Sequence, residues 1–300
     1  MDAAKFKAEL AKTAEEVEKQ LKVLLAAAEA SPALLTDAIS HGSLDGGKRL
    51  RPFLLHTSAA LFTSGEQALV RDTALALECI HCYSLIHDDL PSMDNDELRR
   101  GRPTVWKAKG EALAILAGDA LQALAFELIC QNPTPSNALI KAELAKCLAI
   151  ASGRAGMVGG QVRDLAAENQ AEPATFTDVL QIHAQKTGAL IAFSCEAGAI
   201  IGGAEPSTRQ ALKLYGEKLG LAFQLRDDLL DIEGTVENLG KTPGKDTASG
   251  KATLVTALGE EKAKNFLGNL KDGALYALEP FGERAELLRE AVHFVCQRQN

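Results

Sequence analysis

Apolar residues recur at helical spacing along almost the whole chain. In the first segment they stand three, four or seven positions apart, at Leu10, Val17, Leu21, Leu24 and Leu25. The same spacing returns between Leu212 and Leu229. Such residues line one face of an amphipathic helix, whereas a half-buried strand would alternate apolar and polar residues. Sustained alternation is scarce, so the pattern predicts an all-α protein built from packed helices.

Several helix boundaries can be read directly. The apolar helix from Thr73 to Ile86 should end at about Leu90, because Pro91 disfavours the helical conformation of the residue before it. Thr175 and Asp178 have the spacing of a capping box, which predicts a helix start. The Gly-, Pro- and Ser-rich stretches are short and read as loops between packed elements. We therefore expect one domain over residues 1–300.

Composition narrows the functional classes. The chain is 46% hydrophobic and 24% charged, as in globular proteins, and its net charge of −8 argues against a nucleic-acid partner. It shows neither the apolar core of a signal peptide nor an uncharged apolar run of 18 residues, so we expect a cytoplasmic protein without stable membrane insertion. The six cysteines do not imply disulfides, and Cys79 and Cys82, which have the spacing of half a zinc or redox motif, are interpreted as small buried hydrophobes.

The first candidate site is an acidic cluster after the helix that ends near Leu90. It contains Asp88, Asp89 and Asp94, and the first two lie in a last helical turn, where the helix dipole disfavours negative charge. A hard divalent cation would compensate, since Mg²⁺ takes carboxylate oxygens and tolerates bridging phosphates. A solvated acidic loop is the alternative.

A second acidic cluster lies inside an apolar helical segment. Gln224, Asp227, Asp228 and Asp231 stand three, four and seven apart and form one polar stripe. The stripe could simply face water. Two such clusters in one chain favour the other interpretation, in which each holds metal and together they grip a phosphorylated ligand.

Basic residues beside glycine form a third group. Lys48 and Arg51 stand three apart after Gly46 and Gly47, at an expected helix start, an arrangement suited to a diphosphate. Lysine also adjoins glycine or threonine at Lys186, Lys241 and Lys251. Each of these three is weak evidence alone.

In this order the motifs resemble the trans-type isoprenyl diphosphate synthases, most of all the bacterial members that make farnesyl diphosphate. The resemblance runs from Gly46 to Arg298. It rests on five motifs: Gly46-Gly47-Lys48-Arg49-Leu50-Arg51-Pro52, the first Asp-rich motif with four residues between Asp89 and Asp94, Met157-x-x-Gly160-Gln161-x-x-Asp164-Leu165, Lys186-Thr187-Gly188, and Asp227-Asp228-x-x-Asp231. It implies an isoprenoid-synthase-type all-α bundle around a deep apolar pocket, assembled as a homodimer and dependent on Mg²⁺, with Mn²⁺ able to substitute.

The resemblance also implies a role for each matching residue. The residues that would bind isopentenyl diphosphate are Lys48, Arg51, His81 and Arg100. The residues that would ligate metal are Asp88, Asp94 and Asp227, supported by Asp89, Asp228 and Asp231. The residues that would neutralise the allylic diphosphate are Arg99, Lys186, Lys241 and Lys251. Thr187 and Gln224 would line the site where the allylic cation forms. One departure is the absence of the family's usual proline after Thr253.

The implied reaction is a head-to-tail condensation of isopentenyl diphosphate with dimethylallyl or geranyl diphosphate, which releases diphosphate. Tyr83 lies five residues before Asp88, about 7.5 Å along a helix, and with Ser84 beside it the resemblance implies a farnesyl product. The alternative is that Tyr83 is an ordinary core residue, since it lies about 140° around the helix from Asp88. A geranylgeranyl or longer product remains open. A helical HD-type phosphohydrolase at His87 and Asp88, or a non-catalytic prenyltransferase subunit, is disfavoured because both Asp-rich clusters are present.

Overall fold

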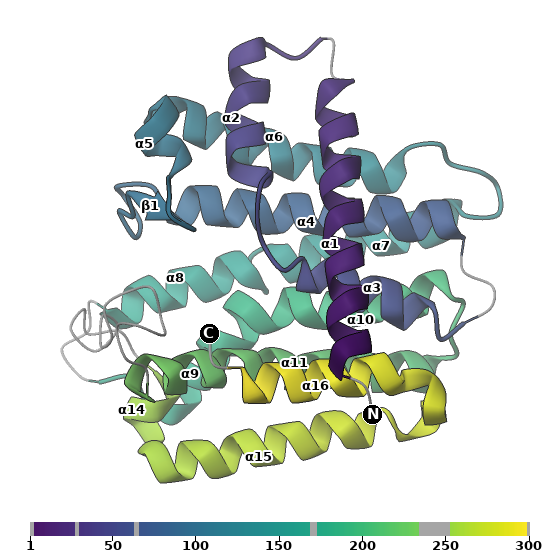
Figure 1. Ribbon diagram of the computed structural model, residues 1–300, viewed down its shortest axis with the longest axis vertical. Coiled ribbons are helices and arrows are strands. Elements are labelled where there is room, and N and C mark those ends of the chain that lie inside the picture. The colour runs from purple at the N-terminus through teal and green to yellow at the C-terminus, as the bar shows by residue number, and fades with distance from the viewer. Residues whose placement is uncertain (1–2, 28–29, 63–65, 169–172, 234–252, 299–300) are drawn as a thin grey trace. The chain divides into compact units, whose positions relative to one another are not determined.

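The computed structural model describes residues 3–27, 30–62, 66–168, 173–233 and 253–298, and the regular elements among them are helices apart from one pair of two-residue strands (Figure 1). The expected all-α class is confirmed. By contacts the chain divides into two compact units, residues 1–56 with 66–145 and residues 57–65 with 146–300. Each unit is described by itself, and the single domain over residues 1–300 stays a prediction.

The first unit is organised around a buried helix. Its helices are α1 (Ala3–Ala26), α2 (Ala33–Ser43), the start of α3 (Leu50–Ala59), α4 (Gln67–Asp88), α5 (Val105–Lys109), α6 (Glu111–Cys130) and the start of α7 (Ala138–Ser152). Leu77 and Ile80 of α4 have no exposed surface, and α4 packs along α6. Gly118 of α6 makes this approach close, because a Cβ atom there would overlap the ring of His87.

A short hairpin follows α4. Strand β1 (Leu98–Arg99) pairs antiparallel with β2 (Arg102–Pro103). The two turn residues, Arg100 and Gly101, have φ values of 54° and 75°, as a tight two-residue hairpin with a primed turn requires. This hairpin was not anticipated, since a pair this short leaves no alternating pattern in the sequence.

The second unit surrounds a helix without an exposed face. Its described elements are α8 (Met157–Glu168), α9 (Phe176–His183), a π-helical turn (Ala184–Gly188), α10 (Ala189–Ile201), α11 (Pro206–Glu233), α14 (Leu254–Leu258), α15 (Glu260–Ala277), a 3₁₀ segment (Glu279–Ala285) and α16 (Glu286–Gln297). Every residue of α10 from Leu190 to Ile201 is buried. The predicted capping box of Thr175 and Asp178 is present at the start of α9.

Helix α11 packs tightly on α10 through small residues. A Cβ atom at Gly216 would lie 2.6 Å from the Cα of Ala192, and one at Gly220 would lie 2.7 Å from the Cα of Gly188. The apolar face predicted between Leu212 and Leu229 is fully buried. Its buried members are Leu212, Tyr215, Leu219, Ala222, Leu225 and Leu229. The opposite side of the same helix is therefore available for polar groups.

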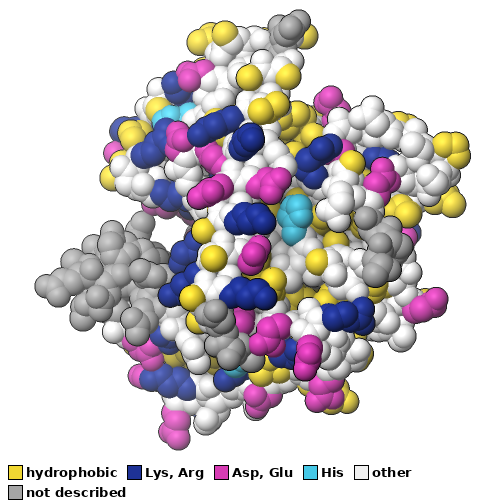
Figure 2. All heavy atoms as spheres, turned by 45° about the vertical axis from the view of Figure 1, so that its right-hand side comes forward, with side chains coloured by type: hydrophobic (Ala, Val, Ile, Leu, Met, Phe, Trp, Pro, Cys, Tyr) yellow, Lys and Arg dark blue, Asp and Glu magenta, His cyan; other side chains and the backbone are white. Residues whose placement is uncertain are grey.

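All six cysteines are free. Cys79 and Cys82 are buried as expected, Cys195 is also buried, and Cys130 is exposed. Helix α6 is long and apolar enough to cross a membrane by length and composition, and 39% of its most apolar window is buried. On the face shown in Figure 2, lysine and arginine side chains are interspersed with aspartate and glutamate.

Candidate active site

The first acidic motif is held by the backbone at the end of α4. The helix ends at Asp88, close to the predicted boundary, and Asp89 caps it. The chain then turns back, so that the amide of Asp94 donates to the carbonyl of Asp88 at 2.9 Å and the amide of Asn95 donates to the carbonyl of Leu90 at 3.0 Å. This closed loop places Asp88 and Asp94, the two predicted metal ligands of the motif, at neighbouring positions.

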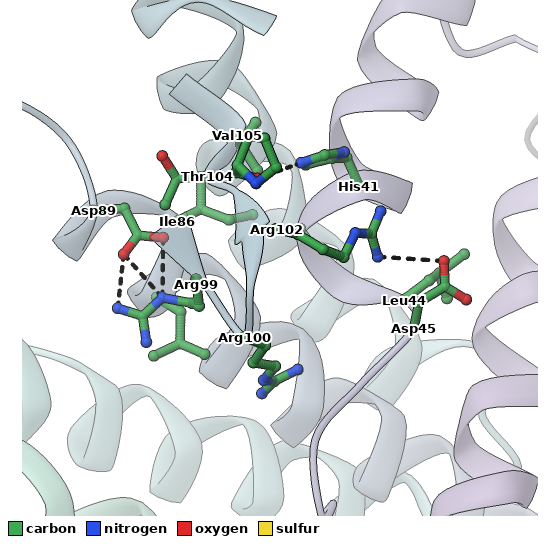
Figure 3. A pocket seen from close by; sticks show the side chains of 13 residues that line it. His41, Leu44, Asp45, Ile86, Asp89, Arg99, Arg100, Arg102, Thr104 and Val105 are labelled. Atoms are coloured by element: carbon green, nitrogen blue, oxygen red, sulfur yellow. Dashed lines mark hydrogen bonds and ion pairs between the residues drawn. The ribbon is translucent and has the colours of Figure 1, made fainter. Parts of the chain in front are cut away.

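Asp89 faces away from water. Only 3% of it is exposed, and Arg99 of β1 grips its carboxylate through hydrogen bonds of 2.7, 2.8 and 3.0 Å (Figure 3). Burial raises the pKa of Asp89 even though Arg99 opposes the rise. Burial also works against the charge of Arg99, but Asp89 raises the pKa of that guanidinium overall. These two residues, expected to serve metal and diphosphate, neutralise each other in this structure.

Hydrogen bonds from neighbouring side chains fix the hairpin that carries Arg99 and Arg100. The hydroxyl of Thr104 and the indole N–H of Trp106 both donate to the carbonyl of Asp96, each at 2.9 Å. His41 of α2 contacts the carbonyl of Pro103 at 2.7 Å. A cavity of about 40 Å³ lies between this hairpin, α2 and α4 (Figure 3). A larger hollow of about 420 Å³, lined in part by Leu24 and Leu75, contains none of the predicted site residues.

Cationic residues converge around His81 of α4. Burial lowers the pKa of His81 well below 6.5, and the charges of Arg51, Arg100, Arg49 and Arg99 lower it further. Burial likewise lowers the pKa of Arg51, whose Nε has no hydrogen-bond partner among the described residues. Three of the residues expected to bind isopentenyl diphosphate are thus neighbours. Lys48, the fourth, is exposed two residues before the start of α3.

Such a group favours an anion. Guanidinium groups match the geometry of a diphosphate, and a neutral imidazole can donate one hydrogen bond to it. His81 and Asp88 lie seven residues apart on α4, hence on the same face and about 10.5 Å apart along the axis. Helix α4 therefore places His81, around which the arginines gather, two turns from the carboxylate of Asp88.

In the second unit the acidic stripe of α11 is largely buried. Asp228 and Asp231 are each 5% exposed, so the alternative in which this stripe faces water fails for both. Asp228 accepts a hydrogen bond from the amide of Leu254 at 2.9 Å and lies 4.0 Å from Nε2 of His183. Oδ1 of Asp231 is buried and has no hydrogen-bond partner among the described residues.

Asp227 forms an ion pair with Arg298, which lies 71 residues later in the sequence. Nη2 of Arg298 lies 2.6 Å from its Oδ1 and also donates to the carbonyl of Phe223 at 2.8 Å. The guanidinium stacks on the Phe223 ring, 3.8 Å from its centroid, and only 8% of the Arg298 side chain is exposed. The predicted metal ligand Asp227 is therefore already neutralised in this structure.

The π-helical turn contains two further predicted site residues, Lys186 and Thr187, and each contacts a neighbouring helix. Lys186 Nζ lies 2.6 Å from Asp164 of α8, and the hydroxyl of Thr187 donates to Gln224 of α11 at 2.9 Å. The turn has one residue more than a regular helical turn, and such bulges are frequent at functional sites. Thr187 and Gln224, expected to act at one place, are in contact.

The carboxylates of the two acidic motifs match the ligands that Mg²⁺ normally takes from a protein. Among the described residues no group of three or more His, Cys, Asp or Glu side chains is placed to hold a metal by itself. Mg²⁺ normally uses one or two carboxylates and completes its shell with water and substrate phosphate. Each acidic motif can supply two such carboxylates. The first offers Asp88 and Asp94, and the second offers Asp227 and, one turn away, Asp231, whose Oδ1 has no hydrogen-bond partner among the described residues.

A family model described as polyprenyl synthetase matches residues 32–273. The chain belongs to the polyprenyl synthetase family. It is 44% identical over 270 residues to a farnesyl diphosphate synthase from Geobacillus stearothermophilus, covering 89% of this chain and 88% of that protein. It is 40% identical over 273 residues to geranylgeranyl pyrophosphate synthase 4 from Arabidopsis thaliana, covering 90% and 72%. It also matches the crystal structure of an FPP/GFPP synthase from Zymomonas mobilis with a TM-score of 0.89 and 41% identity, covering 98% and 100%.

Tyr83, which the family resemblance links to product length, lies at the contact between α4 and α6. It is 5% exposed, and its ring meets the ring of His87 edge-on at 5.7 Å between centroids. His87 in turn contacts the carbonyl of Ile115 at 3.0 Å. Burial raises the pKa of Tyr83 to about 12. Ser84 donates its hydroxyl to the carbonyl of His81 at 2.9 Å.

Some polyprenyl synthetase positions lie elsewhere or were missed. Lys241 and Lys251 lie outside the described residues. Thr253 caps α14 with its side chain, so the segment after Lys251 begins a helix that is joined to Asp228 through the Leu254 amide.

Arg49 was not singled out from the sequence. It is 4% exposed, pairs with Glu78 and Glu18, and donates to the carbonyl of Ser43 at 2.6 Å. Glu78, the one acid within the apolar stretch from Thr73 to Ile86, was the signal that could have revealed this buried pair.

Proposed function

We propose that the chain condenses isopentenyl diphosphate with dimethylallyl or geranyl diphosphate, head to tail, and forms farnesyl diphosphate. The observation that carries this proposal is the pairing of two sites along α4. The cationic side chains of Arg51 and Arg100 lie near His81 of α4, and Asp88 lies two turns further along the same face of that helix, with Asp94 beside it in the following loop. A reaction between two diphosphates, one cleaved and one retained, needs this combination.

The retained diphosphate would bind without metal. Arg51, Arg100 and Lys48 supply charge, and His81 supplies a neutral donor because its pKa lies well below 6.5. The cleaved diphosphate would bind through Mg²⁺ held by Asp88, Asp94 and Asp227. When bound, the ion stabilises the negative charge of the departing diphosphate. Mn²⁺, which has similar ligand preferences, would substitute.

The remaining groups would control the reacting carbon. The C1–O bond of the allylic substrate breaks, the π-bond of isopentenyl diphosphate forms the new C–C bond at C1, and a proton leaves to the released diphosphate. Lys186, positioned by Asp164, adds positive charge, while Thr187 and Gln224 present fixed dipoles to the developing cation. Arg99, Lys241 and Lys251 are proposed to neutralise the same diphosphate, with Asp89 and Asp228 supporting the metal ligands. No nucleophilic side chain is required.

Product length is the finer part of the proposal. The buried aromatic ring of Tyr83 supports a fifteen-carbon limit, because a packed interior does not yield to another isoprene unit. Forty per cent identity to a geranylgeranyl pyrophosphate synthase supports a twenty-carbon product as the second candidate. Radiolabelled isopentenyl diphosphate with each allylic starter, followed by chromatography of the products, tests both. A chain that incorporates no label with any starter contradicts the proposed function.

We further propose that the chain acts as a single domain in the cytoplasm, without nucleic acid and without stable membrane insertion, and that it forms a homodimer. Ile115 and Leu116 of the apolar helix α6 are 44% and 54% exposed, and a second copy would cover them. Light scattering coupled to size-exclusion chromatography measures the assembly directly. A monomer at micromolar concentration would contradict the dimer.

A further inference from the structure

The side chain of Arg100 lies directly on the backbone of two glycines. A Cβ atom at Gly46 would stand 3.1 Å from both Cδ and Nη1 of Arg100, and one at Gly47 would stand 2.9 Å from Nη2 and 3.1 Å from Nη1. Ordinary carbon contacts begin near 3.5 Å. The guanidinium therefore occupies the space that any larger residue at these two positions would take.

Both partners of this contact are held independently. Arg100 sits in the tight turn of the hairpin and points away from the Asp89–Arg99 pair (Figure 3). The glycine loop is fixed behind by Arg49, whose side chain binds the carbonyl of Ser43 and two buried or half-buried carboxylates. The contact is thus set by the fold of the first unit rather than by two mobile ends.

The charges around Arg100 explain why its side chain needs to be held in place. Arg100 has Arg49 and Arg99 as like-charged neighbours and Glu78 as an opposing carboxylate, and partial burial followed by the charge of Arg49 lowers the pKa of Arg100 overall. Repulsion from like charges would drive an unrestrained arginine into solvent. The close approach to the glycine backbone limits that movement and keeps the guanidinium beside His81.

We propose that Gly46 and Gly47 are positioning residues, which hold Arg100 in the place where it binds the diphosphate of isopentenyl diphosphate. This inference rests on the proposed function. In the sequence the glycine pair only preceded two basic residues at an expected helix start. In the structure it provides room for the arginine, and the site is assembled before substrate arrives.

Gly46→Ala is the sharpest test, because Gly46 does not have a positive φ and the three atoms nearest to the new methyl group all belong to Arg100. We expect the dissociation constant for isopentenyl diphosphate, measured by calorimetry, to rise about tenfold, the scale of a misplacement below 1 Å. The unfolding midpoint should hardly change, since the displaced group is the end of a flexible side chain. Gly47→Ala should have a larger effect, because it adds strain at φ 99°.

Gly110→Ala is the matched control. Gly110 has φ 93° and no atom within 4 Å of a Cβ, so this variant introduces strain without touching Arg100. It should lose stability and keep its affinity for isopentenyl diphosphate.

The decisive comparison is Gly46→Ala in an Arg100→Ala background, where it should change the affinity by less than about twofold. An equal loss in both backgrounds, or unchanged affinity in Gly46→Ala alone, would overturn the inference. If Arg100→Ala itself binds as tightly as the natural chain, the proposed role of Arg100 fails, and the inference fails with it.

Discussion

Replacing Arg298 with methionine should destabilise the protein far more than an ordinary substitution near the end of a chain. The side chain is 8% exposed and makes three contacts: an ion pair with Asp227, a hydrogen bond to the carbonyl of Phe223 and a stack on the Phe223 ring. Methionine keeps much of the apolar contact and loses all three polar interactions. These contacts join the residue that follows α16 to α11.

The magnitude follows from the exposure of each partner. Asp227 is 44% exposed, so solvent limits the ion pair to at most about 1 kcal/mol. A charged hydrogen bond to a carbonyl contributes about 1.5–3 kcal/mol, and a desolvated cation–π contact about 1–2 kcal/mol. Since these interactions share one side chain and are not additive, we expect the free energy of unfolding to fall by about 3 kcal/mol.

Urea denaturation followed by circular dichroism, with a chelator present, measures this loss. Arg154→Met is the control, because Arg154 is exposed in the same unit and its replacement should change the unfolding free energy by no more than about 0.5 kcal/mol. Arg298→Lys keeps the charge but loses the planar stack, so its loss of unfolding free energy should lie between those of Arg154→Met and Arg298→Met. A loss below about 1 kcal/mol in Arg298→Met would refute the reasoning.

Three further outcomes are expected. Asp88→Ala and Asp227→Ala should each lower kcat at least about a hundredfold in steady-state assays with saturating Mg²⁺, and wild-type turnover undiminished by excess chelator would contradict the metal site. Tyr83→Ala should convert geranyl diphosphate to products of twenty or more carbons, and an unchanged chromatographic profile would exclude Tyr83 as the limit. Because the folded-state pKa of His81 lies well below its unfolded value of 6.5, the unfolded chain binds the extra proton. Stability should therefore fall below pH 6.5, by up to about 1.4 kcal/mol per pH unit from this group. Urea titrations at pH 7, 6 and 5 should show a shallower fall in His81→Gln, with the slope from His56 remaining.

Much of the helical framework could be predicted because it depends on local rules. The apolar face of α11, the end of α4 before Pro91 and the capping box at Thr175 all follow from spacing within one segment. Both acidic motifs were located for the same reason, since adjacent aspartates on an apolar helix require a partner. The contact between Thr187 and Gln224 agrees with the family resemblance but joins residues 37 positions apart.

The features that were missed depend on contacts between distant segments. The π-helical turn lies where Gly160 of α8 approaches so closely that a Cβ atom there would stand 2.3 Å from the amide nitrogen of Lys186. Hydrophobic spacing carries no information about this packing. Arg49 differs from its basic neighbours because its φ of 48° turns the chain and buries the side chain against Glu78. Residue type alone cannot distinguish it from Lys48, which is exposed.

Two ion pairs of the second unit affect the interpretation of single substitutions at their residues. Lys186 lies 2.6 Å from Asp164, and Arg298 lies 2.6 Å from Asp227. A diphosphate with its metal ions brings both signs of charge, so each residue can exchange its present partner for a new one without leaving a buried charge uncompensated. Removing one partner leaves the other without compensation, and part of any measured loss is that penalty. Asp227→Ala should therefore be measured both alone and in the Arg298→Met background, because in that background the loss of the carboxylate leaves no buried cation uncompensated.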